Sequence, residues 1–158
     1  PINAAYADEI DRLIAARRLT SHVTWTGYVD DVAVSAYLTA SDAVVLPFRD
    51  GASYRRGSLM AAVQHGCAII TTQPTTRIPL FKDGENMLLA RPHVLDENCP
   101  PFFHISHKIL QLYRDPALRE RLRAGAVALA DEFNWATIAA DTVAFFEAVI
   151  ADRKRQSS

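Results

Sequence analysis

Two short apolar runs in the middle of the chain most constrain its fold. Residues 42–47 (DAVVLP) and 67–72 (CAIITT) are continuous and rich in β-branched side chains, which is typical of strands buried on both faces of a sheet. The segment between them ends in a helix pattern over residues 58–66, closed by Gly66. A strand, a helix and a second strand in this order predict a right-handed crossover and therefore a parallel sheet.

The rest of the chain continues this alternation, with another short strand expected at residues 87–90. The predicted fold class is therefore α/β, a Rossmann-like parallel sheet with helices on both faces. We predict one domain over residues 1–158, with a C-terminal helix over residues 134–153. Apolar spacing predicts further helices over residues 4–18, 104–113 and 116–133. We also predict a strand over 22–27, followed by a helix that Asp30 or Asp31 caps.

Composition argues against several classes of partner. The formal net charge is −1 over 158 residues, so no global field draws the chain to nucleic acid or to anionic lipid. No run reaches the roughly 18 apolar residues of a membrane span. Two cysteines, Cys67 and Cys99, are too few for a disulfide framework and favour a reducing, cytoplasmic compartment. The chain lacks an initial Met and starts almost directly in a helix pattern, so we expect a piece of a longer protein or a processed chain.

A polar loop separates the first buried strand from its helix. Arg55 and Arg56 precede Gly57 and Ser58, at the expected start of that helix. Unpaired N–H groups and the helix dipole attract anions there, and guanidinium groups bind phosphate in a bidentate manner. In this interpretation the loop forms a cradle for a diphosphate, and Asp50 and Ser53 hold neighbouring hydroxyl groups. The alternative is a surface loop with two solvated arginines, because loop arginines are common.

An ordered series of segments resembles a known family. The segments are VTWTGYV, LTASDAVVLPF, AAVQHG, AIITT, FKDGENMLL and DPALRERL followed by FNW. Together they resemble the C-terminal, sugar-donor-binding half of the family 4 retaining glycosyltransferases, which have the GT-B fold. The resemblance covers residues 10–146, and its specificity comes from the order of the segments rather than from any single motif.

The resemblance implies a function and a set of site residues. The implied function is to bind a nucleotide-sugar, from which the sugar moves to an acceptor with retention while the departing diphosphate is stabilised electrostatically. The catalytic candidates are Asp50, Arg55 and Arg56. The donor-binding candidates are Gly27, Tyr28, Ser53, Gly57, Ser58, Glu85 and Asn86, of which Gly27 and Tyr28 would border the base. We expect no metal, because no Asp-x-Asp motif is present, and no cofactor, because the nucleotide-sugar is a substrate.

The sequence departs from the family pattern in two places. The family carries two glutamates eight positions apart, and counting back from Gly66 places Ser53 and Ala61 there instead. The loop from Pro47 is a little longer than is usual in the family, which would bring Asp50 near the position of the first glutamate. The loop also resembles a subgroup pattern Asp-Gly-x-Ser-x-Arg-Arg-Gly. The family's Arg and Lys that contact the diphosphate, and its whole acceptor-binding half, would lie before Pro1. We therefore expect the isolated chain to be inactive and to need an acceptor-binding N-terminal domain.

Several alternatives remain open at this stage. The chain is a catalytically inactive GT-B-like binding or interaction module if the missing acidic pair reflects lost activity, and self-association would then be expected. A nucleotide-dependent epimerase of the same fold is a remote alternative. Instead of binding the donor, Glu85 and Asn86 could simply belong to a solvated turn beside Asp83 and Gly84. The spacing of one further group matches no closed zinc site: His93, Cys99, His104 and His107.

Overall fold

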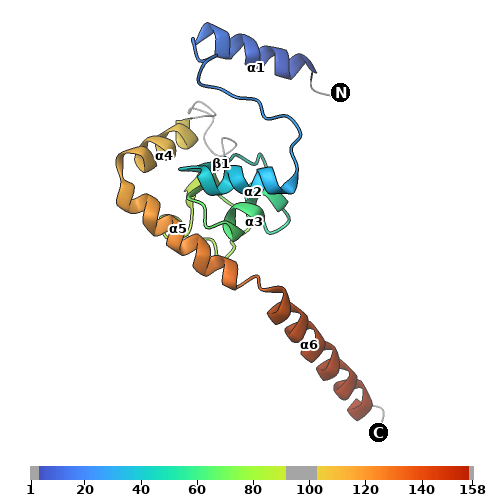
Figure 1. Cartoon of the computed structure of the whole chain (residues 1–158). Coiled ribbons are helices and arrows are strands. Elements are labelled where there is room, and N and C mark those ends of the chain that lie inside the picture. Colours follow the sequence, from blue (N-terminus) through green and yellow to red (C-terminus); the bar gives the residue numbers. More distant parts are fainter. Residues whose placement is uncertain (1–3, 92–102, 157–158) are drawn as a thin grey trace. The chain divides into compact units, whose positions relative to one another are not determined.

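The structure, a computed structural model, describes residues 4–91 and 103–156. The chain divides into two units, Pro1–Val34 and Ser35–Ser158. The smaller unit contains helix α1 (Ala4–Ala16), and the indole nitrogen of Trp25 donates a 2.9 Å hydrogen bond to the Asp11 carboxylate. Helix α2 (Asp31–Ala40) crosses the boundary between the units. The larger unit holds the sheet and the remaining helices (Figure 1).

Three parallel strands form the sheet of the larger unit. They are β1 (Val44–Leu46), β2 (Ile69–Thr72) and β3 (Leu88–Ala90), in the spatial order β1-β2-β3. All four residues of β2 are buried, as expected for a central strand covered on both faces. The predicted α/β fold class with a parallel sheet is confirmed.

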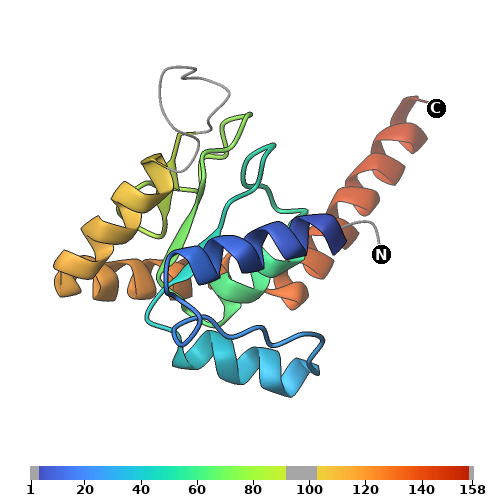
Figure 2. The same ribbon diagram turned by 90° about the horizontal axis from the view of Figure 1, so that it is seen from above.

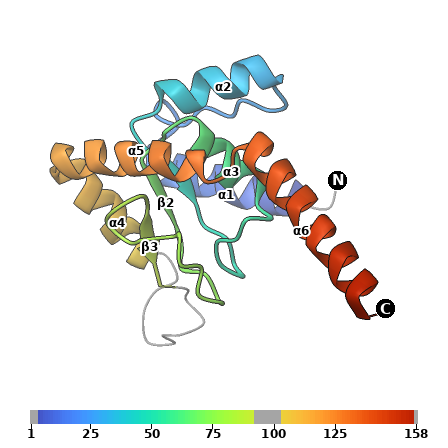
Figure 3. The ribbon, with the colours of Figure 1, turned by 90° about the horizontal axis from the view of Figure 1, so that it is seen from below.

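Helices cover both faces of this sheet. Helix α3 (Gly57–Gln64) packs with Ile69 and Met87 on one face, whereas helix α4 (Phe103–Arg114) packs with Ile70 and Leu88 on the other. Figure 2 and Figure 3 show α3 and α4 on opposite sides of the strands. Helix α5 (Pro116–Asp131) joins the two layers. Its first half packs with α4 and its last turn packs with α3.

Polar residues set the helix ends where the sequence predicts them. The carboxylate of Asp30 accepts a 2.8 Å hydrogen bond from the backbone N–H of Ala33, which caps α2. Asp115 caps α5 in the same way through the N–H of Leu118, and Pro116 is the first helical residue. Gly66 follows the C-cap residue of α3, His65, and has a φ of +60°, the left-handed conformation that favours glycine at a helix end. Helix α6 (Trp135–Gln156) begins one residue later than the predicted C-terminal helix over 134–153 and extends three residues beyond it.

The predicted strand over residues 22–27 is wrong. These residues have no regular secondary structure, and the side chains of Val23 and Trp25 are 38% and 65% exposed. The sequence pattern favours a strand, but a strand forms only when a neighbour satisfies its backbone N–H and C=O groups. The described residues provide no such neighbour for this segment.

The two cysteines fall on different parts of the chain. Cys67 is buried at 1% exposure, and its thiol contacts the carbonyl of Leu38 at 3.4 Å. Burial raises the pKa of this thiol, and the positive charge of Arg123 opposes that effect. Cys99 lies outside the described residues. Cys67 is therefore a free, protonated core residue rather than a reactive one.

One helical stretch is apolar enough to raise the question of a membrane. Within the described residues, Pro116–Arg153 meets a test of length and composition for a membrane-spanning helix. The stretch joins α5 and α6 and is interrupted at residues 132–134. Core helices of water-soluble proteins also pass this test, so it is weak support for a span. The expectation of no membrane span stays a prediction.

Candidate functional site

The loop between β1 and α3 leaves the sheet at the carboxyl ends of its strands. A parallel sheet binds ligands at this edge, because the connecting loops open outward there. The N–H of Ala52 donates to the carbonyl of Thr72 at 3.1 Å, which joins this loop to the end of β2. Gly51 has a φ of +84°, and a Cβ atom there would lie 2.6 Å from the carbonyl oxygen of Gln73. Only glycine allows this close packing between the two loops.

A cavity of about 450 Å³ opens between these two loops. The loop after β1 contributes Asp50, Ser53, Arg55 and Arg56, so the structure brings four of the predicted site residues together. The remaining lining residues are Ala52 from the same loop and Thr75, Thr76 and Ile78 from the loop after β2. The cavity is therefore lined by two guanidinium groups, one carboxylate and three hydroxyl groups.

The two arginines of the cavity differ in their surroundings. Arg56 forms an ion pair with Asp50, and its guanidinium carbon lies 4.9 Å from the centre of the Phe48 ring. Both contacts fix this side chain in place and use part of its charge. Arg55 is exposed and forms no hydrogen bond or ion pair with any residue that the structure describes. Arg55 is thus the cavity arginine whose donors are available.

The first turn of α3 begins directly after this pair. Arg56 occupies the N-cap position, and no side chain within residues 4–91 and 103–156 caps the helix. Among the described residues, no acceptor is found for the backbone N–H groups of Gly57, Ser58 and Leu59. A Cβ atom on Gly57 would meet nothing within 4 Å, so the helix end faces open space. Gly57 and Ser58 do not line the cavity itself, but they continue the chain from Arg56 at its rim.

The threonines at the end of β2 have a structural role. The hydroxyl of Thr71 donates to the carbonyl of Leu46 at 2.8 Å, and that of Thr72 donates to the carbonyl of Phe48 at 2.6 Å. Both side chains are buried and hold the start of the loop against β2. Thr75 and Thr76 are the threonines that reach the cavity.

Gly27 and Tyr28 lie in the smaller unit. Gly27 has a φ of +61°, the conformation expected for a glycine turn, and Tyr28 is fully exposed. The Tyr28 side chain therefore packs against no other described residue. Contact of these residues with a base stays a prediction.

Glu85 and Asn86 are not brought to the cavity. They precede β3 and therefore lie at the amino end of that strand, whereas the cavity lies at the carboxyl ends. Asn86 is buried, and its side chain accepts from the N–H of Lys82 at 2.9 Å and donates to the carbonyl of Leu80 at 2.8 Å. Glu85 is exposed and pairs with Lys82 at 3.3 Å. Both polar side chains serve the turn itself.

The histidine-rich segment is only partly described. His93 and Cys99 lie outside the described residues, and the described part contains no group of three or more residues suited to hold a metal. His104 and His107 line a separate cavity of about 440 Å³. In that cavity Lys108 forms an ion pair with Asp83 at 3.0 Å.

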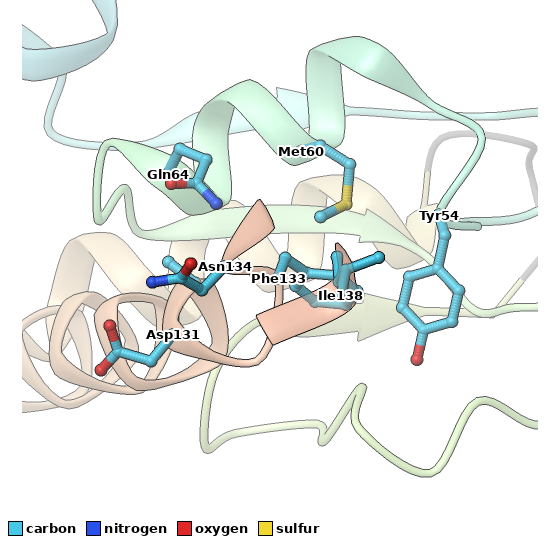
Figure 4. Close-up of a pocket in the computed structure, with 8 residues that line it drawn as sticks. Tyr54, Met60, Gln64, Asp131, Phe133, Asn134 and Ile138 are labelled. Carbon is cyan, nitrogen blue, oxygen red and sulfur yellow. The ribbon is translucent and has the colours of Figure 1, made fainter. Parts of the chain in front are cut away.

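The sequence reasoning missed Tyr54. Its ring lies 5.1 Å from the ring centres of both Phe81 and Phe133. It also lines a larger, mostly apolar cavity of about 740 Å³, together with residues of α3 and of the junction between α5 and α6 (Figure 4). Burial raises the pKa of the Tyr54 hydroxyl. The available signal was an aromatic residue directly before the two arginines, in a loop that also carries Phe48.

Comparisons with known proteins agree with this architecture. The family described as glycosyl transferases group 1 matches residues 3–115. No curated protein matches the chain. Among solved structures, the chain is similar to the C-terminal domain of the glycosyl transferase group 1 family protein LpcC from Francisella tularensis, with 21% identity and a TM-score of 0.66. It is also similar to a sucrose-phosphate synthase from Thermosynechococcus elongatus, with 22% identity and a TM-score of 0.69.

These similarities differ in how much of each protein they cover. The match to the LpcC domain covers 84% of this chain and 64% of that domain. The match to the synthase covers 94% of this chain but only 35% of the synthase. The chain thus spans about a third of the synthase and two thirds of the LpcC domain. The two structures support the GT-B type of fold. Because the family match covers more than half of the chain, the chain belongs to the glycosyl transferases group 1 family.

Proposed function

We propose that this chain is the sugar-donor-binding part of a retaining glycosyltransferase. Its site would bind the diphosphate of a nucleotide-sugar between Arg55 and the first turn of α3. The observation that carries this proposal is the pairing of an unpartnered guanidinium with uncapped helical N–H groups at the carboxyl edge of the sheet. Both groups donate hydrogen bonds and carry positive charge, which a diphosphate requires.

The chemistry follows from the charge that develops when the glycosidic bond breaks. The diphosphate gains negative charge as it leaves, so donors fixed in advance stabilise the transition state more than the ground state. Helical N–H groups cannot reorient, and Arg55 adds a full charge. Arg56 would contribute less while Asp50 holds it. Asp50, which is exposed at the mouth of the cavity, is the candidate to face the sugar.

The missing glutamates shift the expected ribose contact to other residues. Ala61 cannot accept a hydrogen bond from a ribose hydroxyl, although it stands where the family pattern places the second glutamate. Ser53, Thr75 and Thr76 line the cavity and offer hydroxyl groups of their own. Hydroxyl groups accept more weakly than carboxylates do, so we expect weaker binding of the ribose than in enzymes that carry the acidic pair.

Transfer of the sugar would require a second domain. The chain covers only 35% of the similar sucrose-phosphate synthase, so most of a protein of that size lies outside this similarity. We propose that an acceptor-binding domain supplies the other side of the site and that the isolated chain binds a nucleotide-sugar without transferring it. We propose a cytoplasmic location for the assembled protein, where nucleotide-sugars are available.

A second candidate function is an inactive interaction module. Helix α6 supports this alternative, because it exposes a set of large apolar side chains that usually mark an interface: Val143, Phe145, Phe146, Val149 and Ile150. A self-associating protein whose melting temperature does not respond to nucleotides would favour this candidate. Analytical ultracentrifugation with and without nucleotide distinguishes the two.

Titration calorimetry tests the main proposal. We expect UDP-, GDP- or ADP-sugars to bind, the free diphosphates UDP, GDP or ADP to retain most of that affinity, and the matching nucleosides to lose it. Ligand at about one hundred times its Kd should also stabilise the fold by about 2.7 kcal/mol. Absence of binding by every nucleotide, or equal binding by nucleoside and diphosphate, would contradict a diphosphate site.

A further inference from the structure

We propose that Tyr54 is a positioning residue that holds the loop after β1 so that Arg55 faces the cavity. This inference rests on the proposed function, because Arg55 is the residue whose placement matters there. Tyr54 does not line the cavity of about 450 Å³. It would act through the backbone of the loop alone.

The Tyr54 ring joins three separate parts of the chain. Its edge meets Phe81 at an interplanar angle of 72°, and it is tilted by 56° to Phe133. Phe81 belongs to the core at 7% exposure, and Phe133 packs against the same core from the segment directly after α5. Aromatic contacts of this geometry stabilise beyond the surface that they bury. The Tyr54 side chain stays 42% exposed, so the ring is a second attachment of this loop to the core, after the buried Ala52.

Neighbouring side chains of this loop line two different cavities. The N–H of Arg56 donates to the carbonyl of Ser53 at 3.1 Å, which makes residues 53–56 a turn with Tyr54 and Arg55 at its centre. Tyr54 lines the cavity of about 740 Å³, whereas Arg55 lines the cavity of about 450 Å³. Among the residues that the structure describes, the two cavities share no lining residue. Holding the Tyr54 side chain therefore restrains the backbone from which the Arg55 side chain leaves toward the other cavity.

Arg55 depends on this backbone more than Arg56 does. Arg56 has Asp50 and Phe48 to hold its side chain, but Arg55 has no partner among the described residues. Tyr54 itself forms no hydrogen bond with a described residue, so the ring and not the hydroxyl is the positioning group. Because burial raises its pKa, the hydroxyl stays protonated and adds no charge to the loop. Phenylalanine keeps the ring and lacks only the hydroxyl, so it should hold the loop as well as Tyr54 does.

Two measurements on the same variants test the inference. Amide hydrogen exchange reports how often the turn opens, and titration with inorganic pyrophosphate reports the anion site. We expect Tyr54→Ala to speed the exchange of the Arg56 amide and to weaken pyrophosphate binding, each about tenfold. Tyr54→Phe should leave both within about twofold. Tyr113→Ala, which removes an exposed tyrosine of α4, is the matched control.

A double variant separates positioning from general destabilisation. Adding Tyr54→Ala to Arg55→Ala should weaken pyrophosphate binding no further, because Arg55 is the group that Tyr54 places. Independent, additive losses would overturn the inference. If circular dichroism shows that Tyr54→Ala is unfolded, Tyr54→Leu keeps apolar volume without the ring and takes its place.

The exchange measurement keeps this inference distinct from the proposed function. If the unaltered protein does not bind pyrophosphate, the proposed anion site fails. Faster exchange in Tyr54→Ala alone would still support the placement of the turn by Tyr54. Unchanged exchange in that variant overturns the inference whatever the ligand does.

Discussion

Two turns of this chain look alike in sequence and differ in structure. Asp50-Gly51 follows β1, and Asp83-Gly84 precedes β3. Both glycines have a positive φ, of +84° and +77°. Around Asp83-Gly84 polar groups have partners within the protein: Asp83 accepts from the N–H of Leu89 and from Lys108, and the carbonyl of Gly84 accepts from Arg121. Around Asp50-Gly51 it leaves Arg55 and the tip of α3 unused.

The difference shows how to distinguish a structural turn from a binding loop. Polar residues in a turn that lies against packed helices find partners within the protein, because buried polar groups without partners are costly. A loop at the carboxyl edge of a parallel sheet opens outward, so its donors can remain available. Unused donors, rather than the Asp-Gly pair itself, mark the candidate site.

The largest expected effect is on the structural turn. Asn86→Ala leaves the N–H of Lys82 and the carbonyl of Leu80 without their buried partner, which should lower the free energy of unfolding by about 2–4 kcal/mol. Denaturant unfolding measures this loss. Glu85→Ala removes only an exposed ion pair and should cost less than about 0.5 kcal/mol. Equal effects of the two changes would contradict the structural role of Asn86.

The second effect is on the glycine of the binding loop. Gly51→Ala places a Cβ atom against the carbonyl of Gln73 and forces a strained φ, at a cost of about 1–3 kcal/mol. Gly84→Ala strains φ to a similar extent but meets no atom within 4 Å, so it should cost about 1 kcal/mol. A thermal melt compares the two variants. The close contact between the two loops is contradicted if Gly84→Ala is the more destabilising change.

Matched substitutions of the two aspartates sharpen the comparison. Asp83→Ala removes a partner from Leu89 and from the largely buried Lys108, and it should cost about 1–2 kcal/mol of stability without changing pyrophosphate affinity. Asp50 is exposed, so Asp50→Ala should change stability by less than about 0.5 kcal/mol. It should also raise pyrophosphate affinity about threefold, because it releases Arg56 and removes a negative charge. Weaker binding by Asp50→Ala would contradict this assignment.

The smallest effect separates folding from binding at the helix tip. Gly57→Ala meets open space and replaces a glycine in the first turn of α3, so it should stabilise the protein by up to about 1 kcal/mol. The same methyl group stands where a diphosphate would approach the backbone, so pyrophosphate affinity should fall. A variant that is more stable and binds equally well would show that no ligand approaches Gly57. Melting temperature and calorimetry on the same sample report both quantities.

Much of the fold follows from local sequence patterns. The β-branched runs at β1 and β2, the Pro116 start of α5 and the Gly66 end of α3 each report a preference of the local backbone. The segment over 22–27 has the same kind of pattern but forms no strand, because a strand also needs a partner that local sequence does not specify. Topology then placed the loop of Arg55 at the edge where ligands bind.

The details of the site depend on side-chain contacts that no spacing rule predicts. Arg56 pairs with Asp50 within one loop, and Tyr54 contacts Phe133 from a distant part of the chain. The segment of Glu85 and Asn86 resembles a family loop near the donor sugar, yet it lies at the amino end of β3. Sequence could therefore identify which residues are polar and on which loop they lie, but not which of them already have partners.

Calorimetric titration of UDP into two arginine variants tests the central claim most directly. Arg55 lines the cavity, whereas Arg77 is an exposed arginine of the neighbouring loop and does not line it. Arg77→Ala is the matched control, because both alanine variants remove one positive charge. Loss of a charged hydrogen-bond donor predicts about 10- to 100-fold weaker binding for Arg55→Ala and a change within about twofold for Arg77→Ala. Equal affinities in the two variants would contradict a diphosphate site at Arg55 and the tip of α3.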